Sequence, residues 1–278
     1  MPALDPTAQS LLAEARQLHV GVLTTTGPHV TPELYTYDDG NLWFLTAADT
    51  LKTRVVRRDP RVAAVVRVGS NSLLVSGIVT DYDIGDPVRL LTQAKDALRA
   101  LAALMSFAVR NAADLAAFAR DLAAGRLQSR LPQRRVLMRL VPDRVVLLDG
   151  TALVATDGEW PGRVTVPDDA PALVGDIDCV VGAETADGMI VLPGRASEDL
   201  AEATVPAVAV QLADVAIDEA VRGGIVIDDY RAPGPAAKRG ELIRGRLRFE
   251  LDDAQCRVRL DGERDTTWAG AQVSTTAL

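Results

Sequence analysis

The stretch GPHVTPELYTYDDGNLWFLTAADTLKTRVVRRDP, from Gly27 to Pro60, decides the fold of the N-terminal half. β-Type residues alternate over 29–37 and return over 42–45, and DDGN at 38–41 lies between the two runs. Asp, Gly and Asn between two such runs favour a tight hairpin. The polar run TAADTLK follows at 46–52 and leads into a basic helix start, so two hydroxyls and an amine gather where a strand ends.

Further β-type runs surround this stretch, at 20–25, 62–68, 73–80 and 136–148. Strands at such short spacing predict an antiparallel sheet or a small barrel. The pattern changes between Pro87 and about Leu127, where apolar residues recur at a period of 3.6 and predict an amphipathic helix. We expect its stripe to be buried, either on a barrel or at a subunit contact; the stripe consists of Leu91, Leu98, Leu101, Met105 and Ala108.

Composition limits the classes of function. The chain has 278 residues, 48% of them hydrophobic, with a formal net charge of −8. This excess of acids argues against general nucleic-acid binding. The N-terminus does not have the pattern of a signal peptide and no run reaches the roughly 20 apolar residues of a membrane span, so we expect a cytoplasmic protein. Cys179 and Cys256 do not have metal-ligand spacing and are expected to be buried, reduced thiols.

A faint duplication runs through the chain. GPHVTP at 27–32 matches GMIVLP at 188–193, and 135–150 matches 255–270 without a gap. Shorter matches lie between these anchors: VAAVV at 62–66 with IVIDD at 225–229, and LLVSGIV at 73–79 with LIRGRL at 242–247. The alternative is chance similarity between two β meanders. We predict two related barrels, a first domain at 1–150 with a helical insertion at 86–127, and a second, degenerate domain at 151–278.

These residues, in this order, resemble the flavin-binding split β-barrel superfamily, which includes pyridoxamine 5'-phosphate oxidase-like proteins and the flavin- and deazaflavin-dependent oxidoreductases. The resemblance covers 18–83 well and its most specific element is the Thr-x-x-x-Thr-x-Lys run at 46–52 ahead of a basic helix and Asp-Pro. It implies a mainly β (α+β) fold of tandem antiparallel Greek-key barrels. It also implies FMN as cofactor, with the deazaflavin coenzyme F-420 as the alternative and haem as a third choice.

The resemblance also answers what TAADTLK is for, because in that family this run holds the cofactor phosphate. Thr46 and Thr50 would supply hydroxyl donors, Lys52 the positive charge, and Thr53 lies at a candidate helix N-terminus, which attracts anions. The alternative is an ordinary solvated loop with an exposed lysine. Further cofactor contacts implied by the resemblance are Thr31, Pro32 and Ser72.

The second copy departs from the motif. Its counterpart is expected at Leu212–Gly224, with Ile217 and Asp218 where Lys52 should be. An acid there would repel a phosphate. We therefore expect the second barrel to complete the groove from the other side through Lys238 and Trp268, for which a surface cation and a core aromatic are the alternatives.

The resemblance implies an oxidoreductase that acts on a small organic substrate through FMN or a deazaflavin, with an intrachain pseudo-dimer or a homodimer as the assembly. Val30 and Tyr35 stand where pyridoxamine phosphate oxidases carry Arg and Lys, which argues against vitamin B6 oxidation. No catalytic residue is assigned. The alternatives are a flavin or haem carrier without turnover, for which His29 is a candidate axial ligand, and a barrel without cofactor.

Overall fold

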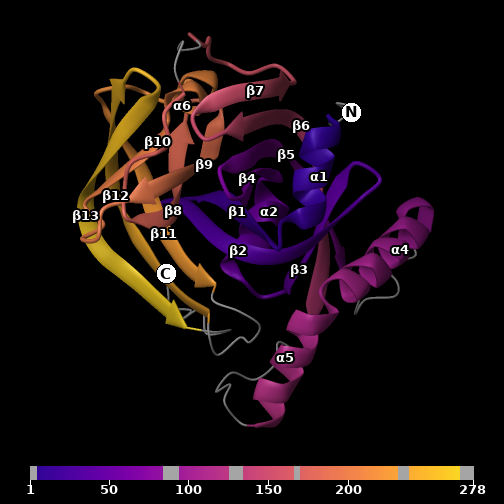
Figure 1. Ribbon diagram of the computed structural model, residues 1–278. Coiled ribbons are helices and arrows are strands. Elements are labelled where there is room, and N and C mark those ends of the chain that lie inside the picture. The colour runs from indigo at the N-terminus through magenta and orange to yellow at the C-terminus, as the bar shows by residue number, and fades with distance from the viewer. Residues whose placement is uncertain (1–4, 84–93, 125–133, 166–169, 231–237, 270–278) are drawn as a thin grey trace.

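The structure is a computed structural model, and it describes residues 5–83, 94–124, 134–165, 170–230 and 238–269. Two antiparallel barrels lie side by side, and the helices α4 (Ala94–Arg110) and α5 (Ala112–Ala123) lie outside the first of them (Figure 1).

The first barrel consists of six strands that close on themselves. Their order is β3-β2-β1-β4-β5-β6, and β3 pairs with β6 to complete the ring. A seventh strand, β7 (Ala152–Asp157), extends the sheet from β6. The strands of the ring are β1 (Gln17–Thr24), β2 (Gly27–Asp38), β3 (Asn41–Ala47), β4 (Arg61–Val68), β5 (Asn71–Asp83) and β6 (Arg135–Asp149).

The second barrel repeats this arrangement. Its closed order is β10-β13-β12-β11-β8-β9, so that β8 to β13 follow the same path as β1 to β6. This identity of topology confirms the prediction of tandem antiparallel barrels. The strands are β8 (Ile177–Thr185), β9 (Gly188–Ala196), β10 (Glu202–Pro206), β11 (Ala220–Tyr230), β12 (Lys238–Asp252) and β13 (Gln255–Ala269).

The strand registers define equivalent positions in the two barrels. Gly21 lies opposite Val30, as Gly182 lies opposite Val191, so the anchors at 27–32 and 188–193 correspond as predicted. The match between 135–150 and 255–270 also holds, because Met138 faces Phe44 as Val258 faces Ala203.

One of the shorter matches is wrong by two residues. Gly21 pairs with Ala63 in the first barrel and Gly182 pairs with Gly224 in the second, so 62–66 corresponds to 223–227 rather than to 225–229. The sequence comparison aligned the most hydrophobic letters, whereas two glycines open the true counterpart. Gly77 and Gly245 correspond as predicted, because they lie opposite Val62 and Gly223.

The two barrels share a hydrophobic core. Val30, Val65 and Leu148 of the first barrel belong to the same buried cluster as Val181, Leu192 and Phe249 of the second. At the edge of this core, arginines form hydrogen bonds between the two barrels. Arg61 donates to the backbone oxygen of Asp187 in the β8–β9 turn (3.2 Å), and Arg222 donates to the backbone oxygen of Thr25 in the β1–β2 turn (2.6 Å). Arg61 and Arg222 are equivalent positions, so each barrel donates a hydrogen bond from the same position to a turn of the other barrel.

Short helices connect the third and fourth strands of each barrel. These are α2 (Leu51–Arg58) in the first and α6 (Ala207–Leu212) in the second. A further helix, α1 (Pro6–Glu14), precedes β1, and the Asp5 side chain caps it by accepting from the Thr7 N–H at 2.7 Å. No helix among the described residues is long and apolar enough to span a bilayer.

The insertion between β5 and β6 contains α4 (Ala94–Arg110) and α5 (Ala112–Ala123). The expectation that its stripe would be buried on a barrel is wrong, because Leu98 is 79% exposed and Leu101 and Met105 are also exposed. Alanines at 100 and 103 face inward instead, with Phe107, because small side chains let the helix lie close to Trp43 and Tyr82. Ala108 is half-buried and Leu91 lies outside the described residues, while a subunit contact through this face stays a prediction.

Both cysteines are expected to be inert in the native protein. Cys179 and Cys256 are buried, and burial is the main cause that raises the pKa of each thiol to about 12. Since the thiolate is the reactive form, we expect no reaction with Ellman's reagent at pH 8 and two thiols per chain in urea. Rapid native reaction of either thiol would contradict this burial.

Candidate functional site

The run TAADTLK forms the end of β3 and the start of α2. Thr50 is the N-cap of α2, and its hydroxyl accepts from the Thr53 N–H at 3.2 Å. The Thr53 hydroxyl donates to the Ala47 oxygen at 2.8 Å and lies 2.9 Å from the Thr50 hydroxyl, which is 3.1 Å from the same oxygen. Capping by threonine satisfies donors that a helix otherwise leaves open. Both threonines therefore shape the turn that presents Lys52.

Lys52 lies in the first turn of α2 and is buried, with 3% of its side chain exposed. Its ammonium forms an ion pair with the carboxylate of Glu33, which is 16% exposed, and lies 5.7 Å from the centre of the Phe44 ring. A buried charge needs a partner. The alternative of an exposed, solvated lysine is wrong, because the amine is buried and paired with Glu33.

Glu33 comes from β2, on the same face as Thr31 and His29, because side chains alternate along a strand. His29 is buried and its Nδ1 lies 2.8 Å from Nη2 of Arg244, a residue of β12 in the second barrel. Burial, and then the positive charges of Arg244 and Lys52, lower the pKa of His29 to about 3. The imidazole is therefore neutral at physiological pH.

Arg135 adds a further cation at the start of β6, opposite Ala47. Burial lowers the pKa of this guanidinium from its ordinary value, while the carboxylates of Glu33 and Asp49 raise it. Lys52 and Arg135 thus both act on Glu33, whereas Lys52 and Arg244, which comes from the other barrel, both act on His29. The described side chains do not include a cluster of three His, Cys, Asp or Glu residues that would hold a metal ion.

The remaining predicted residues lie on the first barrel. Thr31 is half-buried with its hydroxyl 3.4 Å from Glu33 Oε1, and Pro32 pairs with His19 across β1 and β2. Thr46 is buried in β3 opposite Val136, one residue from the strand end. Ser72 is buried in β5 between Arg67 and Leu148, at the other end of that strand from the helical insertion. A cofactor contact by any of them stays a prediction.

Lys238 and Trp268 are placed by their backbones alone. Lys238 starts β12 opposite Tyr230, and Trp268 lies in β13 opposite Gly240. Their side chains are outside the described residues, and their role stays a prediction.

The expected counterpart of the motif in the second barrel is misplaced. The helix equivalent to α2 is α6, which has the sequence AVAVQL, whereas Ile217 and Asp218 follow that helix and adjoin Phe249. The acid therefore does not occupy the position of Lys52. The sequence comparison missed this because α6 shares no polar motif with α2, and five of its six residues are buried.

Sequence reasoning also missed Glu33, Arg135 and Arg244. Alternation along β2 was a usable signal for Glu33, because positions 29, 31 and 33 share one face of the strand. Arg135 directly precedes the recognised run of β6. No local signal identifies Arg244, which reaches His29 from 215 residues away.

One protein-family model matches part of the first barrel. The family model described as pyridoxamine 5'-phosphate oxidase matches residues 5–78, which confirms the resemblance over that range. Two solved structures are similar: an FMN-binding protein related to pyridoxamine 5'-phosphate oxidase from Nostoc punctiforme (18% identity, 53% of this chain, 87% of that chain, TM-score 0.37) and general stress protein 26 from Bacillus anthracis (13%, 51%, 90%, 0.33). A structure named F420 reductase covers 51% of this chain and 98% of its own, with 19% identity and a TM-score of 0.34. No curated protein matches.

Proposed function

We propose that the protein is an oxidoreductase that binds FMN or a deazaflavin between its two barrels and acts on a small organic substrate. The observation that carries this proposal is the buried Lys52 ammonium, held in the first turn of α2 beside polar groups from both barrels. The matched family range includes the whole TAADTLK run. We infer that the two barrels act as an intrachain pseudo-dimer, since Arg244 of one reaches His29 of the other.

The residues present fit an anionic group. Lys52 and Arg135 lie near the carboxylate of Glu33, Arg244 lies beside His29, and a phosphate accepts charge-assisted hydrogen bonds from such donors. Lys52 would hold the phosphate, with Arg244 closing the site from the second barrel. Without a cofactor, Glu33 pairs with the buried ammonium. A bound phosphate would have to displace the Glu33 carboxylate from Lys52.

The protein's own groups would bind and orient rather than transfer protons. A bound flavin or deazaflavin supplies hydride-transfer chemistry. His29 stays neutral far below neutral pH, because its pKa lies near 3, so it cannot donate a proton at pH 7. It can accept a hydrogen bond from Arg244 and thereby fix the direction of that guanidinium. The packed barrels on either side would keep water from the reacting atoms.

The same neutral imidazole supports a second candidate function, that of a flavin or haem carrier without turnover. A histidine must be neutral to act as an axial ligand, and His29 meets that condition. The absorption spectrum of the purified, cofactor-loaded protein distinguishes a flavin, a deazaflavin and a haem. Reduction of a quinone or nitro dye then separates an enzyme from a carrier.

A titration with FMN tests the site. We expect Lys52→Ala to weaken binding by roughly ten- to a hundredfold, because a charge-assisted hydrogen bond of about 1–3 kcal/mol is lost. Lys52→Arg should recover part of this loss, since it keeps the charge with different donor geometry. Glu33→Gln should tighten binding, because it removes the carboxylate that competes for Lys52. Asp218→Asn is the control.

Two outcomes would contradict the proposal when flavin fluorescence is followed for the wild type and each variant. Binding of Lys52→Ala that is as tight as wild type, for both FMN and the deazaflavin, would show that the phosphate is held elsewhere. A wild-type protein that binds neither would remove the oxidoreductase proposal and favour the haem carrier.

A further inference from the structure

The repeat of one topology gives the chain two equivalent seams between its barrels. Two units that meet through the same surface create every contact twice. The first seam, here called the His29 seam, contains His29 of β2, Lys52 of α2 and Arg244 of β12. The second, here called the Ile190 seam, contains Ile190 of β9 and Ser76 of β5. The registers make Ile190 equivalent to His29 and Ser76 equivalent to Arg244.

The two seams carry different chemistry. Where the His29 seam has an imidazole and a guanidinium in contact, the Ile190 seam has an isoleucine and a hydroxyl. The helix α2 brings Lys52 to the first seam, whereas α6 contains no basic residue. The positions equivalent to Lys52 and Arg244 therefore carry no cation in the Ile190 seam.

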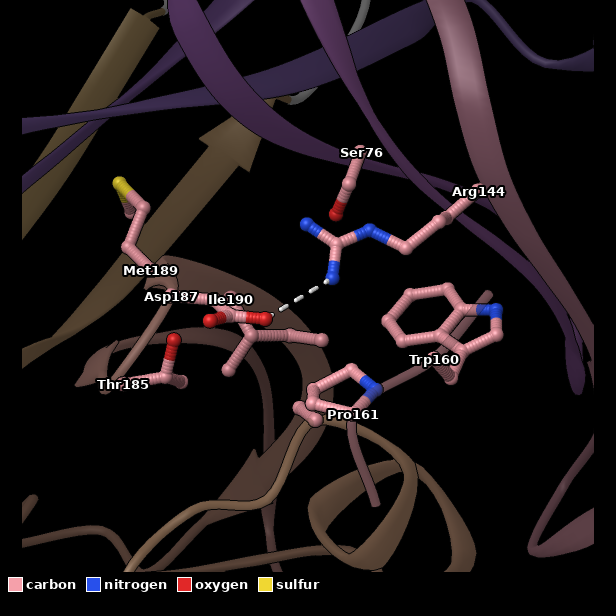
Figure 2. A pocket seen from close by; sticks show the side chains of 9 residues that line it. Ser76, Arg144, Trp160, Pro161, Thr185, Asp187, Met189 and Ile190 are labelled. Carbon is pink, nitrogen blue, oxygen red and sulfur yellow. Dashed lines mark ion pairs between the residues drawn. The ribbon is translucent and has the colours of Figure 1, made fainter. Parts of the chain in front are cut away.

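The Ile190 seam is also occupied by the chain itself. Figure 2 shows Arg144 reaching from β6 between Ser76 and Asp187, with the Trp160 ring beside its guanidinium. Arg144 lies 3.7 Å from the Asp187 carboxylate, and its guanidinium carbon lies 5.4 Å from the centre of the Trp160 ring. The cation that reaches this seam thus already has a carboxylate and an aromatic ring as neighbours within the chain.

The segment that carries Trp160 is fixed in place. The indole N–H donates to the Asp157 oxygen at 3.2 Å, and the Gly162 N–H donates to the Leu212 oxygen at the end of α6 at 2.9 Å. A Cβ atom at Gly162 would come 1.7 Å from the Gln211 oxygen, so the segment is pressed against α6. Because α6 is the equivalent of α2, this segment lies against the element that would have to present a phosphate-binding residue.

We propose that the protein binds one cofactor per chain, in the His29 seam, and that Trp160 and Arg144 close the equivalent Ile190 seam. This inference rests on the proposed function. It adds the number of cofactors per chain and the seam in which the cofactor binds. The second barrel then contributes Arg244 to a single site instead of holding a second site of its own.

Stoichiometric titration tests the number of sites. With protein well above the dissociation constant, we expect the fluorescence of added FMN to break at one FMN per chain. A break at two per chain overturns the inference and leaves the proposed function standing. If neither FMN nor the deazaflavin binds, the proposed function fails and this inference fails with it.

Matched variants test which of the two seams binds FMN. Arg244→Gln should weaken FMN binding roughly tenfold, and Arg244→Lys should weaken it less. Arg144→Gln and Trp160→Phe, at the other seam, should leave the affinity within about twofold of wild type. Thermal melts of all four variants check that they fold. Weakened binding from the Ile190 seam variants, with normal binding by Arg244→Gln, would place the ligand on the opposite side and overturn the inference.

Discussion

Lys52→Met is expected to lower the free energy of unfolding by about 3 kcal/mol, because it leaves the largely buried Glu33 carboxylate without its partner. Removing one member of a buried ion pair is far more destabilising than removing the pair, since the remaining charge has lost both water and its counter-ion. The double variant Lys52→Met/Glu33→Leu should therefore recover most of the loss. Urea unfolding of the two single variants and the double variant measures the coupling.

A surface ion pair provides the control for this prediction. Arg259 and Glu202 lie 3.1 Å apart but are each about half exposed, so Arg259→Met should change stability by less than about 1 kcal/mol. If Lys52→Met behaved like this control, the Lys52–Glu33 pair would not exist in solution. The site would then have an uncommitted lysine, and Glu33→Gln would not tighten FMN binding.

The unfolding free energy is expected to fall as the pH is lowered, with a contribution from His29 of about 1.4 kcal/mol per pH unit. The pKa of His29 is about 3 in the folded protein, because burial and the neighbouring Arg244 and Lys52 disfavour its charge, while an unfolded histidine titrates near 6.5. Between these values the unfolded chain binds the proton and the folded protein does not. Stability from this group is therefore complete above pH 6.5 and is progressively lost below it.

His29→Gln isolates this contribution, because carboxylates and other groups titrate alike in the variant and the wild type. Urea unfolding between pH 7.5 and 4.5 should show a wild-type curve that falls by about 3 kcal/mol more than that of the variant. Equal slopes would contradict burial of a neutral His29. His19, whose pKa is lowered to about 4 by burial and then by Arg67, is present in both proteins, so its contribution cancels in this comparison.

The sequence predicted those features that local patterns encode. Hairpin signals at 38–41, glycines that recur at 27 and 188 and at 77 and 245, and the alternation of strands were enough to predict two related barrels. The sequence also placed Lys52 correctly between the end of a strand and the start of a helix, because TAADTLK lies between those two patterns. Each of these depends on residues close together in the chain, where backbone preference and side-chain alternation act directly.

Features that depend on distant contacts could not be predicted in this way. The pairing of Lys52 with Glu33, and of His29 with Arg244, arises only when the strands close and the barrels meet. The orientation of α4 was predicted with the wrong face inward because both faces are apolar. The prediction chose the face with the leucines, whereas the face with the alanines packs on the barrel. The counterpart of α2 was missed because a buried six-residue helix carries no polar signature.

The covalent connection of the two barrels has a consequence for how the protein can change over evolutionary time. In a symmetric dimer of identical chains, one codon alters both copies of a site, so the two copies cannot diverge. Here His29 and Ile190 are encoded separately, as are Arg244 and Ser76, and each can be selected alone. The tether also holds the barrels at a fixed effective concentration, so that dilution does not separate them. The two seams can therefore diverge by mutation while the two barrels stay assembled.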